Sequence, residues 1–188
     1  FPTRRSSDLS PTASTLSSPG ATLSVAGKFF IADSSNSRIL GYNSVPTTST
    51  ASADFVLGQP NFNVNTLNNG GRSAATLYSP RQMSSDGQKF AVADYGNHRI
   101  LIWNSIPNSN AQPADVVVGQ PDMSSGTANN GGISAATLNV PNGVVLAENK
   151  LIVADQTNNR LLIWDPIPTA NGTPATYVIG QPDFVTNT

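Results

Sequence analysis

The feature that most constrains this chain is an internal repeat with a spacing of 61 residues. Identical residues recur three times at this spacing, and no insertion breaks the register. The recurring sets are Asp33, Asp94 and Asp155; Arg38, Arg99 and Arg160; Pro19, Pro80 and Pro141; Gln59, Gln120 and Gln181; Lys28, Lys89 and Lys150; and Pro46, Pro107 and Pro168. A fixed spacing indicates supersecondary units that bury apolar surface against their neighbours. The sequence therefore predicts three equivalent units.

Each unit contains short apolar segments that predict β-strands. In the third unit they are GVVLAE (143–148), LIVAD (151–155), RLLIWD (160–165) and ATYVIGQ (175–181). Apolar and β-branched residues bounded by Asn, Gly or Pro are typical of strands joined by turns. Four antiparallel strands per unit predict an all-β fold. Specifically, we expect a partial β-propeller of three four-stranded antiparallel blades.

The blades are expected at about 16–62, 77–123 and 138–184, within an incomplete propeller of residues 10–188. A closed propeller needs about four to eight blades, so we expect this chain to be a fragment of a larger protein. Blades pack face to face, which would leave the outer faces of the terminal blades open. We therefore expect the isolated fragment to self-associate through its exposed blade faces.

The first nine residues do not belong to the repeat. FPTRRSSDL resembles the translation of a common sequencing adapter, and such non-native segments are left out of fold reasoning. The chain has 10 Lys and Arg and 11 Asp and Glu; without Arg4, Arg5 and Asp8 these become 8 and 10. This balance is unlike that of a nucleic-acid-binding protein. The chain has no cysteine and no apolar run of the ~20 residues that span a membrane.

An acid and a base flank the polar turn of each unit. In the second unit, Asp94 ends one expected strand and Arg99 begins the next, which places the charges opposite each other in a hairpin. We expect Asp94 to accept hydrogen bonds from N–H groups of the turn, and Asn97 to take a left-handed conformation. Trp103, at the end of the returning strand, is expected to pack against the neighbouring sheet.

An active site of Asp94, His98 and Arg99 is the alternative interpretation. Repetition disfavours it, because an enzyme rarely needs three equivalent sites, and Ser37 and Asn159 replace the histidine in the other units. Ion-pair networks also imitate sites. We therefore interpret the pairs as structural and assign no catalytic or metal-binding residue. The structural pairs are Asp33 with Arg38, Asp94 with Arg99, and Asp155 with Arg160.

The segments VADYGNHRILIW and VADQTNNRLLIW resemble the core of the NHL repeat, a β-propeller blade motif. VPNGVVLAENKL resembles the lead into the first strand of that repeat, and VVVGQPDM, FVLGQPNF and VIGQPDF resemble blade ends of bacterial members with long blades. The first unit departs from the pattern with Gly41 and Tyr42. The second departs with Arg81, which follows Pro80 where Gly or Asn is usual.

The connections between units carry a repeated Asn-Asn-Gly-Gly sequence. In a propeller these connections lie on the same rim as the turns between the second and third strands. Their asparagines could form a polar ring that recognises a peptide or glycan, or could simply serve the turn that reaches the next blade. The candidate rim residues are Asn68, Asn69, Asn129 and Asn130.

We expect a non-catalytic binding or structural module of a bacterial NHL-repeat protein, exported or at the cell surface, with a protein, peptide or glycan as partner. No cofactor and no nucleic acid is expected. The alternative is a metal-dependent lyase or hydrolase whose site lies in blades outside this chain, because the inner strands offer only Asp86 and Glu148. A third hypothesis, RNA binding as in some NHL domains, is disfavoured by the scarcity of Lys and Arg.

Overall fold

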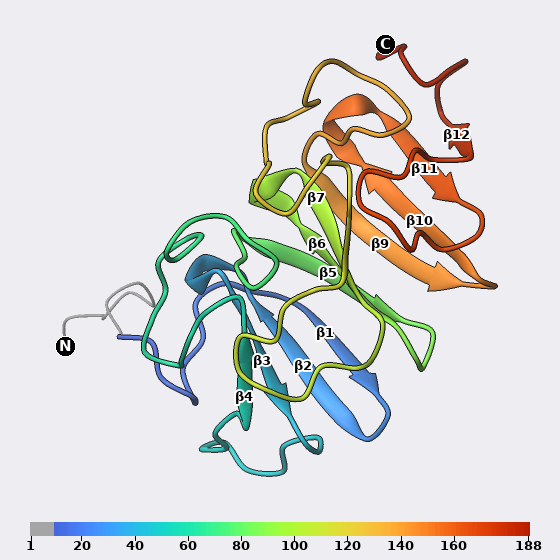
Figure 1. Ribbon diagram of the computed structural model, residues 1–188. Helices are drawn as coiled ribbons and strands as arrows, with labels where there is room; N and C mark the ends of the chain where they lie inside the picture. The colour runs from blue at the N-terminus through green and yellow to red at the C-terminus, as the bar shows by residue number, and fades with distance from the viewer. Residues whose placement is uncertain (1–9) are drawn as a thin grey trace.

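The computed structural model describes residues 10–188, and the adapter-like segment 1–9 lies outside the described residues. The described chain is all-β, as predicted, and forms three four-stranded antiparallel sheets (Figure 1). The first contains β1 (Pro19–Val25), β2 (Lys28–Asp33), β3 (Arg38–Tyr42) and β4 (Phe55–Leu57). The second contains β5 (Pro80–Ser85), β6 (Phe90–Asp94), β7 (Arg99–Trp103) and β8 (Val116–Val118). The third contains β9 (Pro141–Ala147), β10 (Lys150–Asp155), β11 (Arg160–Trp164) and β12 (Tyr177–Ile179).

The strands lie in chain order within each sheet, so each unit is a simple meander. All four strands expected in the third unit are present, although the last is shorter than the predicted segment 175–181. It ends at Ile179 because Gly180 has a φ of 95°, which is outside the extended region. The helical structure of residues 10–188 is limited to turns of three residues, and none could span a membrane.

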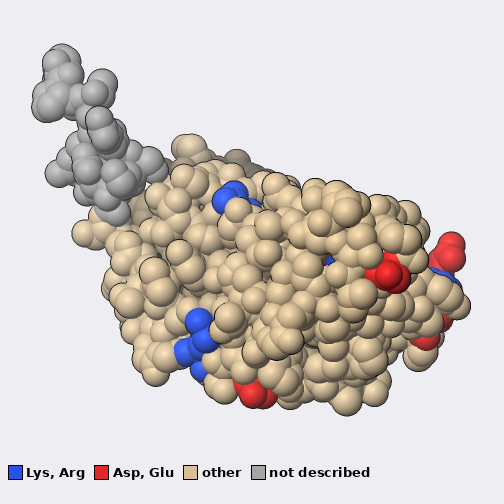
Figure 2. All heavy atoms as spheres, turned by 90° about the horizontal axis from the view of Figure 1, so that it is seen from above, with Lys and Arg blue, Asp and Glu red and all other residues tan. Residues whose placement is uncertain are grey.

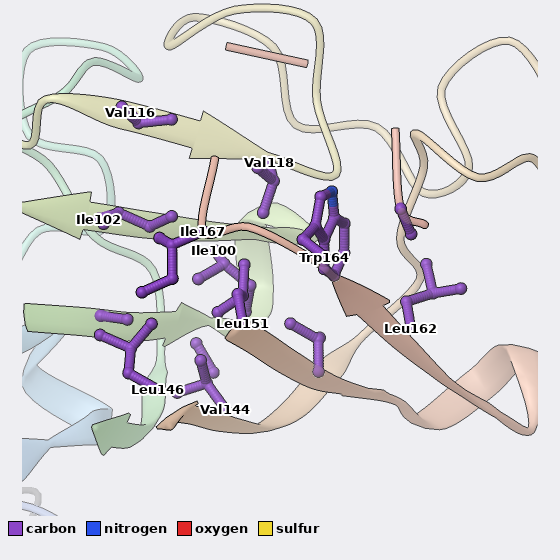
Figure 3. Packing of buried hydrophobic residues seen from close by; sticks show 14 of the residues in the cluster. Ile100, Ile102, Val116, Val118, Val144, Leu146, Leu151, Leu162, Trp164 and Ile167 are labelled. Atoms are coloured by element: carbon purple, nitrogen blue, oxygen red, sulfur yellow. The ribbon is translucent and has the colours of Figure 1, made fainter. Parts of the chain in front are cut away.

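Two apolar clusters join the three sheets. Successive side chains of a strand point to opposite faces, and β7 uses both. Leu101 and Trp103 pack toward the first sheet, whereas Ile100 and Ile102 pack toward the third. Figure 3 shows the second of these clusters, with Trp164 of β11 among the residues between the sheets. The expected packing of Trp103 against the neighbouring sheet is thus confirmed.

The first strands of the three sheets lie beside one another. β5 contacts both β1 and β9, as Figure 1 also shows. Side chains of β5 accept hydrogen bonds from backbone N–H groups of β9, from Val144 to Gln82 Oε1 at 3.2 Å and from Leu146 to Ser84 Oγ at 2.9 Å. β5 therefore lies between β1 and β9.

The last strand of one sheet is paired by a loop that belongs to the next. The amide oxygen of Asn110 accepts a hydrogen bond from Val56 N–H in β4, and that of Asn171 accepts one from Val117 N–H in β8. An unpaired edge strand invites association with another chain. The long loop between the third and fourth strands of one sheet thus forms hydrogen bonds with the edge strand of the preceding sheet.

A leucine anchors each connection between sheets. Leu77 and Leu138 are buried, and they lie against Gly58 and Gly119 at the ends of the preceding sheets. Both glycines have positive φ, and a Cβ at Gly119 would lie 2.4 Å from the Leu138 side chain. Only glycine fits there, because the leucine occupies the space that a side chain would need.

We predict that Leu138→Ala lowers the free energy of unfolding by about 2–5 kcal/mol, because it leaves a cavity between the second and third sheets. Leu67→Ala is the matched control: Leu67 is 52% exposed, and its truncation should change stability by no more than about 0.5 kcal/mol. Denaturant titration followed by tryptophan fluorescence measures both. Equal effects of the two variants would show that Leu138 is not an anchor.

Candidate functional site

The structure places each predicted acid–base pair at the same point of its sheet. Asp94 ends β6, Arg99 begins β7, and the two residues are register partners. The distance from Arg99 Nε to Asp94 Oδ2 is 2.7 Å, and both side chains are fully buried. The corresponding distance is 2.7 Å for Arg38 and Asp33 and 2.8 Å for Arg160 and Asp155, again with no exposed side-chain surface.

The hydrogen bonds of Asp94 differ from those expected. We expected N–H groups of the turn to donate to its carboxylate, but Asp94 forms no such cap. Instead, Tyr78 N–H donates to Oδ1 and the Asn97 side-chain amide donates to Oδ2, both at 2.8 Å. The carboxylate therefore joins the hairpin to the connection that precedes β5.

The left-handed residue of the turn is also one position later than expected. Tyr95–Asn97 forms a single turn of 3-10 helix, and His98 follows with a φ of 53°. Ser37 and Asn159 take the same conformation in the other sheets. Our expectation for Asn97 was wrong because its side chain is buried and held by Asp94, while the chain reverses direction at the next residue.

Arg99 uses its remaining donors on backbone carbonyls. Its Nη2 donates to Ser73 O and Thr76 O, both at 2.9 Å, and its Nη1 donates to Met123 O. These acceptors belong to two different connections between sheets. Arg38 and Arg160 each donate to three carbonyls in the same way. With four hydrogen bonds already made, the guanidinium is a clamp between loops and is not placed to bind a substrate.

Burial raises the pKa of the Asp94 carboxyl above its ordinary value. The Arg99 guanidinium and the hydrogen bonds from Tyr78 and Asn97 oppose this effect. A carboxylate removed from water is stable only with such partners. The pair is therefore a buried network in which each member depends on the others.

The rim asparagines hold the connections against the hairpin turns. The side chains of Asn68 and Asn97 exchange two hydrogen bonds, both of 2.8 Å. Asn129 and Asn158 exchange equivalent bonds of 3.0 and 2.7 Å. These contacts place the connections beside the hairpin turns, and they occupy the side-chain amide of the first asparagine in each Asn-Asn pair.

The second asparagine of each pair forms fewer hydrogen bonds with the rest of the described chain. Asn69 is half-buried, and Asn130 donates one hydrogen bond of 3.3 Å to Gln120 Oε1. Asn130 also lines a cavity of about 230 Å³ between the second and third sheets. The other residues around this cavity, which we call the rim cavity, are Pro121, Ser134, Ala136, Thr137 and Gly172.

A second, larger cavity of about 310 Å³ lies where the first strands meet. We call it the first-strand cavity, and it is lined by Gly20, Ala21, Arg81, Gln82 and Asn142. These are the second and third residues of β1 and β5 and the second residue of β9. Arg81 departs from the repeat in the sequence, but we did not predict it as a site residue. The sequence did contain a signal for this site, because a charged residue interrupts the repeat at position 81.

The acidic candidates on the inner strands lie outside both cavities. Asp86 is exposed beyond β5, where its Oδ1 accepts hydrogen bonds from Gln88 N–H and Lys89 N–H in a turn. Glu148 is exposed beyond β9. Within residues 10–188, no three His, Cys, Asp or Glu side chains are grouped closely enough to hold a metal ion.

No family model matches the chain, and a search of curated proteins found no match. Among solved structures, a glutaminyl cyclase from Myxococcus xanthus is similar, with 12% identity, a TM-score of 0.49, and coverage of 92% of this chain and 56% of that chain. A polycomb repressive complex 2 structure is also similar, with 12% identity, a TM-score of 0.45, and coverage of 80% and 29%. The chain thus spans 56% and 29% of the lengths of these neighbours. At this identity and with TM-scores below 0.5, neither similarity assigns a family, an activity or a partner.

We predict that Asp94→Asn lowers the free energy of unfolding at neutral pH by about 3–5 kcal/mol, because Arg99 then stays buried without a compensating charge. The control is Lys150→Met at the ion pair of Lys150 with Asp165, whose side chains are 35% and 36% exposed. Removing an exposed pair should cost about 0–1 kcal/mol. Denaturant titration compares the two variants. If Asp94→Asn lowered the free energy of unfolding by no more than Lys150→Met does, the clamp would be refuted.

His98, the one histidine of the chain, links the second and third sheets. Its Nδ1 accepts a hydrogen bond of 3.0 Å from Val140 N–H. Burial lowers the pKa of His98, Arg72 lowers it further, and Asp94 and Asp155 act in the opposite direction. Ser37 makes a comparable contact with Ser79 N–H in the first sheet.

Because the folded chain binds a proton at His98 less readily than the unfolded chain, we predict that the free energy of unfolding decreases as the pH falls from about 7 to 5. His98→Asn, which introduces the residue of the third unit, should remove this dependence. Denaturant titrations of both proteins at several pH values test the prediction, because the difference between their slopes isolates His98 from the carboxyl groups, among them Asp94 with its raised pKa. The same slope in both proteins would contradict it.

Proposed function

We propose that residues 10–188 form blades of an NHL-type β-propeller that serves as a non-catalytic binding scaffold. The 61-residue repeat, the meander of each sheet and the neighbouring first strands support this arrangement. The resemblance of the hairpin segments to the NHL repeat supports the family. Side-by-side sheets with their first strands adjacent are the arrangement that a propeller requires.

The observation that carries the proposal is the set of buried arginine clamps. Arg99 holds two connections to one hairpin through three carbonyl groups. Arg160 likewise donates to three carbonyls, two in the connection before its sheet and one in the segment after β12. Loops held in this way lose little conformational entropy when a ligand binds, which favours recognition. Three equivalent clamps with no free functional group are suited to support and not to catalysis.

The rim cavity is where we expect the scaffold to contact its ligand. Asn130, Ser134 and Thr137 bring neutral amide and hydroxyl groups to it, and such groups suit the hydroxyl or amide groups of a glycan or peptide. Charge is scarce on the face in Figure 2, where Lys, Arg, Asp and Glu form small separate spots among other residues. A ligand recognised mainly through charge, such as a nucleic acid, is therefore disfavoured.

The proposal is tested by screening the purified chain against glycan and peptide panels and mapping any hit by two-dimensional NMR. We expect the hit to shift signals of residues 120–138, and Asn130→Ala to weaken it by about ten-fold or more, in line with the loss of a well-placed hydrogen bond. Asn104 is exposed and directly follows β7, and Asn104→Ala is the control that should bind normally.

The same samples distinguish the binding scaffold from an enzyme. A scaffold leaves its ligand unchanged, so mass spectrometry after prolonged incubation should recover the intact compound. Conversion of the compound, or a stoichiometric metal ion in the purified chain on which that conversion depends, would overturn the non-catalytic proposal. Binding that is unaffected by Asn130→Ala would overturn the rim assignment alone.

A further inference from the structure

The first-strand cavity contains a charged residue that the repeat does not explain. At the second position of the first strand, the three units have Gly20, Arg81 and Asn142. The Asp, Asn and Arg side chains of the hairpin clamps are identical in all three units, as packing of equivalent sheets requires. Arg81 belongs to one unit only, so the architecture does not require a charge at this position.

The guanidinium of Arg81 has no ionic partner. It forms no salt bridge with a described residue, and its Nε is buried without a hydrogen-bond acceptor. Its Cζ lies 4.8 Å from the centre of the Tyr95 ring. Stacking on an aromatic ring holds the guanidinium plane in one orientation while its N–H groups stay available.

A buried donor without an acceptor is unfavourable by about 1–3 kcal/mol, and more when the group is charged. The three other arginines at sheet positions, Arg38, Arg99 and Arg160, each have a carboxylate within 2.8 Å. Arg81 has the same donors but faces a cavity. An anion that enters the cavity would supply the ionic partner that the Arg81 guanidinium lacks.

The neighbouring side chains add neutral donors. Gln82 uses its amide oxygen to accept the hydrogen bond from Val144 N–H, and within residues 10–188 its NH₂ group has no protein acceptor. Asn142 lines the same cavity from β9 and is exposed. One cation with two amides matches an anion of one charge that has further hydrogen-bonding capacity.

We propose that the first-strand cavity binds the carboxylate group of a small organic acid, with Arg81 as the bidentate donor. Two parallel N–H···O bonds from a guanidinium fit a carboxylate. A phosphate monoester carries about −1.5 to −2 charge at neutral pH, which one arginine would leave partly uncompensated. The volume of about 310 Å³ is near the lower end for small-molecule sites, and Ala21 offers an apolar surface for the body of the ligand.

The test uses sodium propionate as probe, with propionamide as its neutral analogue and sodium phosphate as the competing anion, all at one ionic strength. Two-dimensional NMR should show that propionate shifts the Arg81 Nε–H and Tyr95 signals, that propionamide does not, and that phosphate binds more weakly than propionate. Absence of a propionate-dependent shift at Arg81, or tighter binding of phosphate, would overturn the proposal.

Arg81→Asn is the decisive variant, because asparagine stands at this position in the third unit and the fold accepts it there. We expect it to weaken propionate binding by about ten-fold or more, as the loss of charge-assisted hydrogen bonds implies. Arg81→Lys keeps the charge but not the planar fork, and it should also bind more weakly. Lys89→Gln removes a charge from an exposed contact with Asn104 and should bind as the parent does. Equal affinity of the parent and Arg81→Asn would refute the site without affecting the rim proposal.

Discussion

The structure depends on a buried ion pair that is formed three times. In each unit an aspartate at the end of the second strand pairs with an arginine at the start of the third, as Asp94 does with Arg99. Isolated, either charge would be strongly destabilised away from water. Each arginine is therefore surrounded by backbone carbonyls from the segments before and after its sheet, and each aspartate by an asparagine amide and a backbone N–H. The need to satisfy two buried charges is what holds long polar loops in defined positions.

Around this network, apolar side chains pack each sheet against the next one along the chain. The middle strands of the second sheet present alternate side chains to the first and third sheets, so Trp103 contacts one cluster and Ile102 the other. Loops add to this connection, because Asn110 and Asn171 complete the edge strands of the preceding sheets. Consecutive units are consequently linked by side chains, by loops and by the first strands. We therefore expect a destabilising substitution in one unit to affect the stability of its neighbour.

The repeat also distinguishes residues that stabilise the fold from residues that we propose as ligand contacts. A residue found in all three units is explained by the requirement that equivalent sheets pack equivalently. Arg81 has no such explanation, and among the arginines in described strands it is the one without a carboxylate partner. Charged groups with unfulfilled partners in a cavity are candidates for ligand contacts. The rim asparagines, which looked more suitable in the sequence, are largely engaged with the hairpin turns.

The sequence by itself determined the class of the fold, the number of units and the strands within them, because a 61-residue spacing and short apolar segments are local signals. It also placed the aspartate and arginine of each pair opposite each other, since a short turn brings its own ends together. Only the tertiary structure decided the partners of those charges: Tyr78 N–H, Ser73 O and Met123 O come from segments 16 to 26 residues away along the chain. It likewise moved the left-handed residue from Asn97 to His98, because burial of one side chain overruled a local preference. The first-strand cavity is visible only in three dimensions, since it joins residues from three units that are adjacent in space and not in sequence.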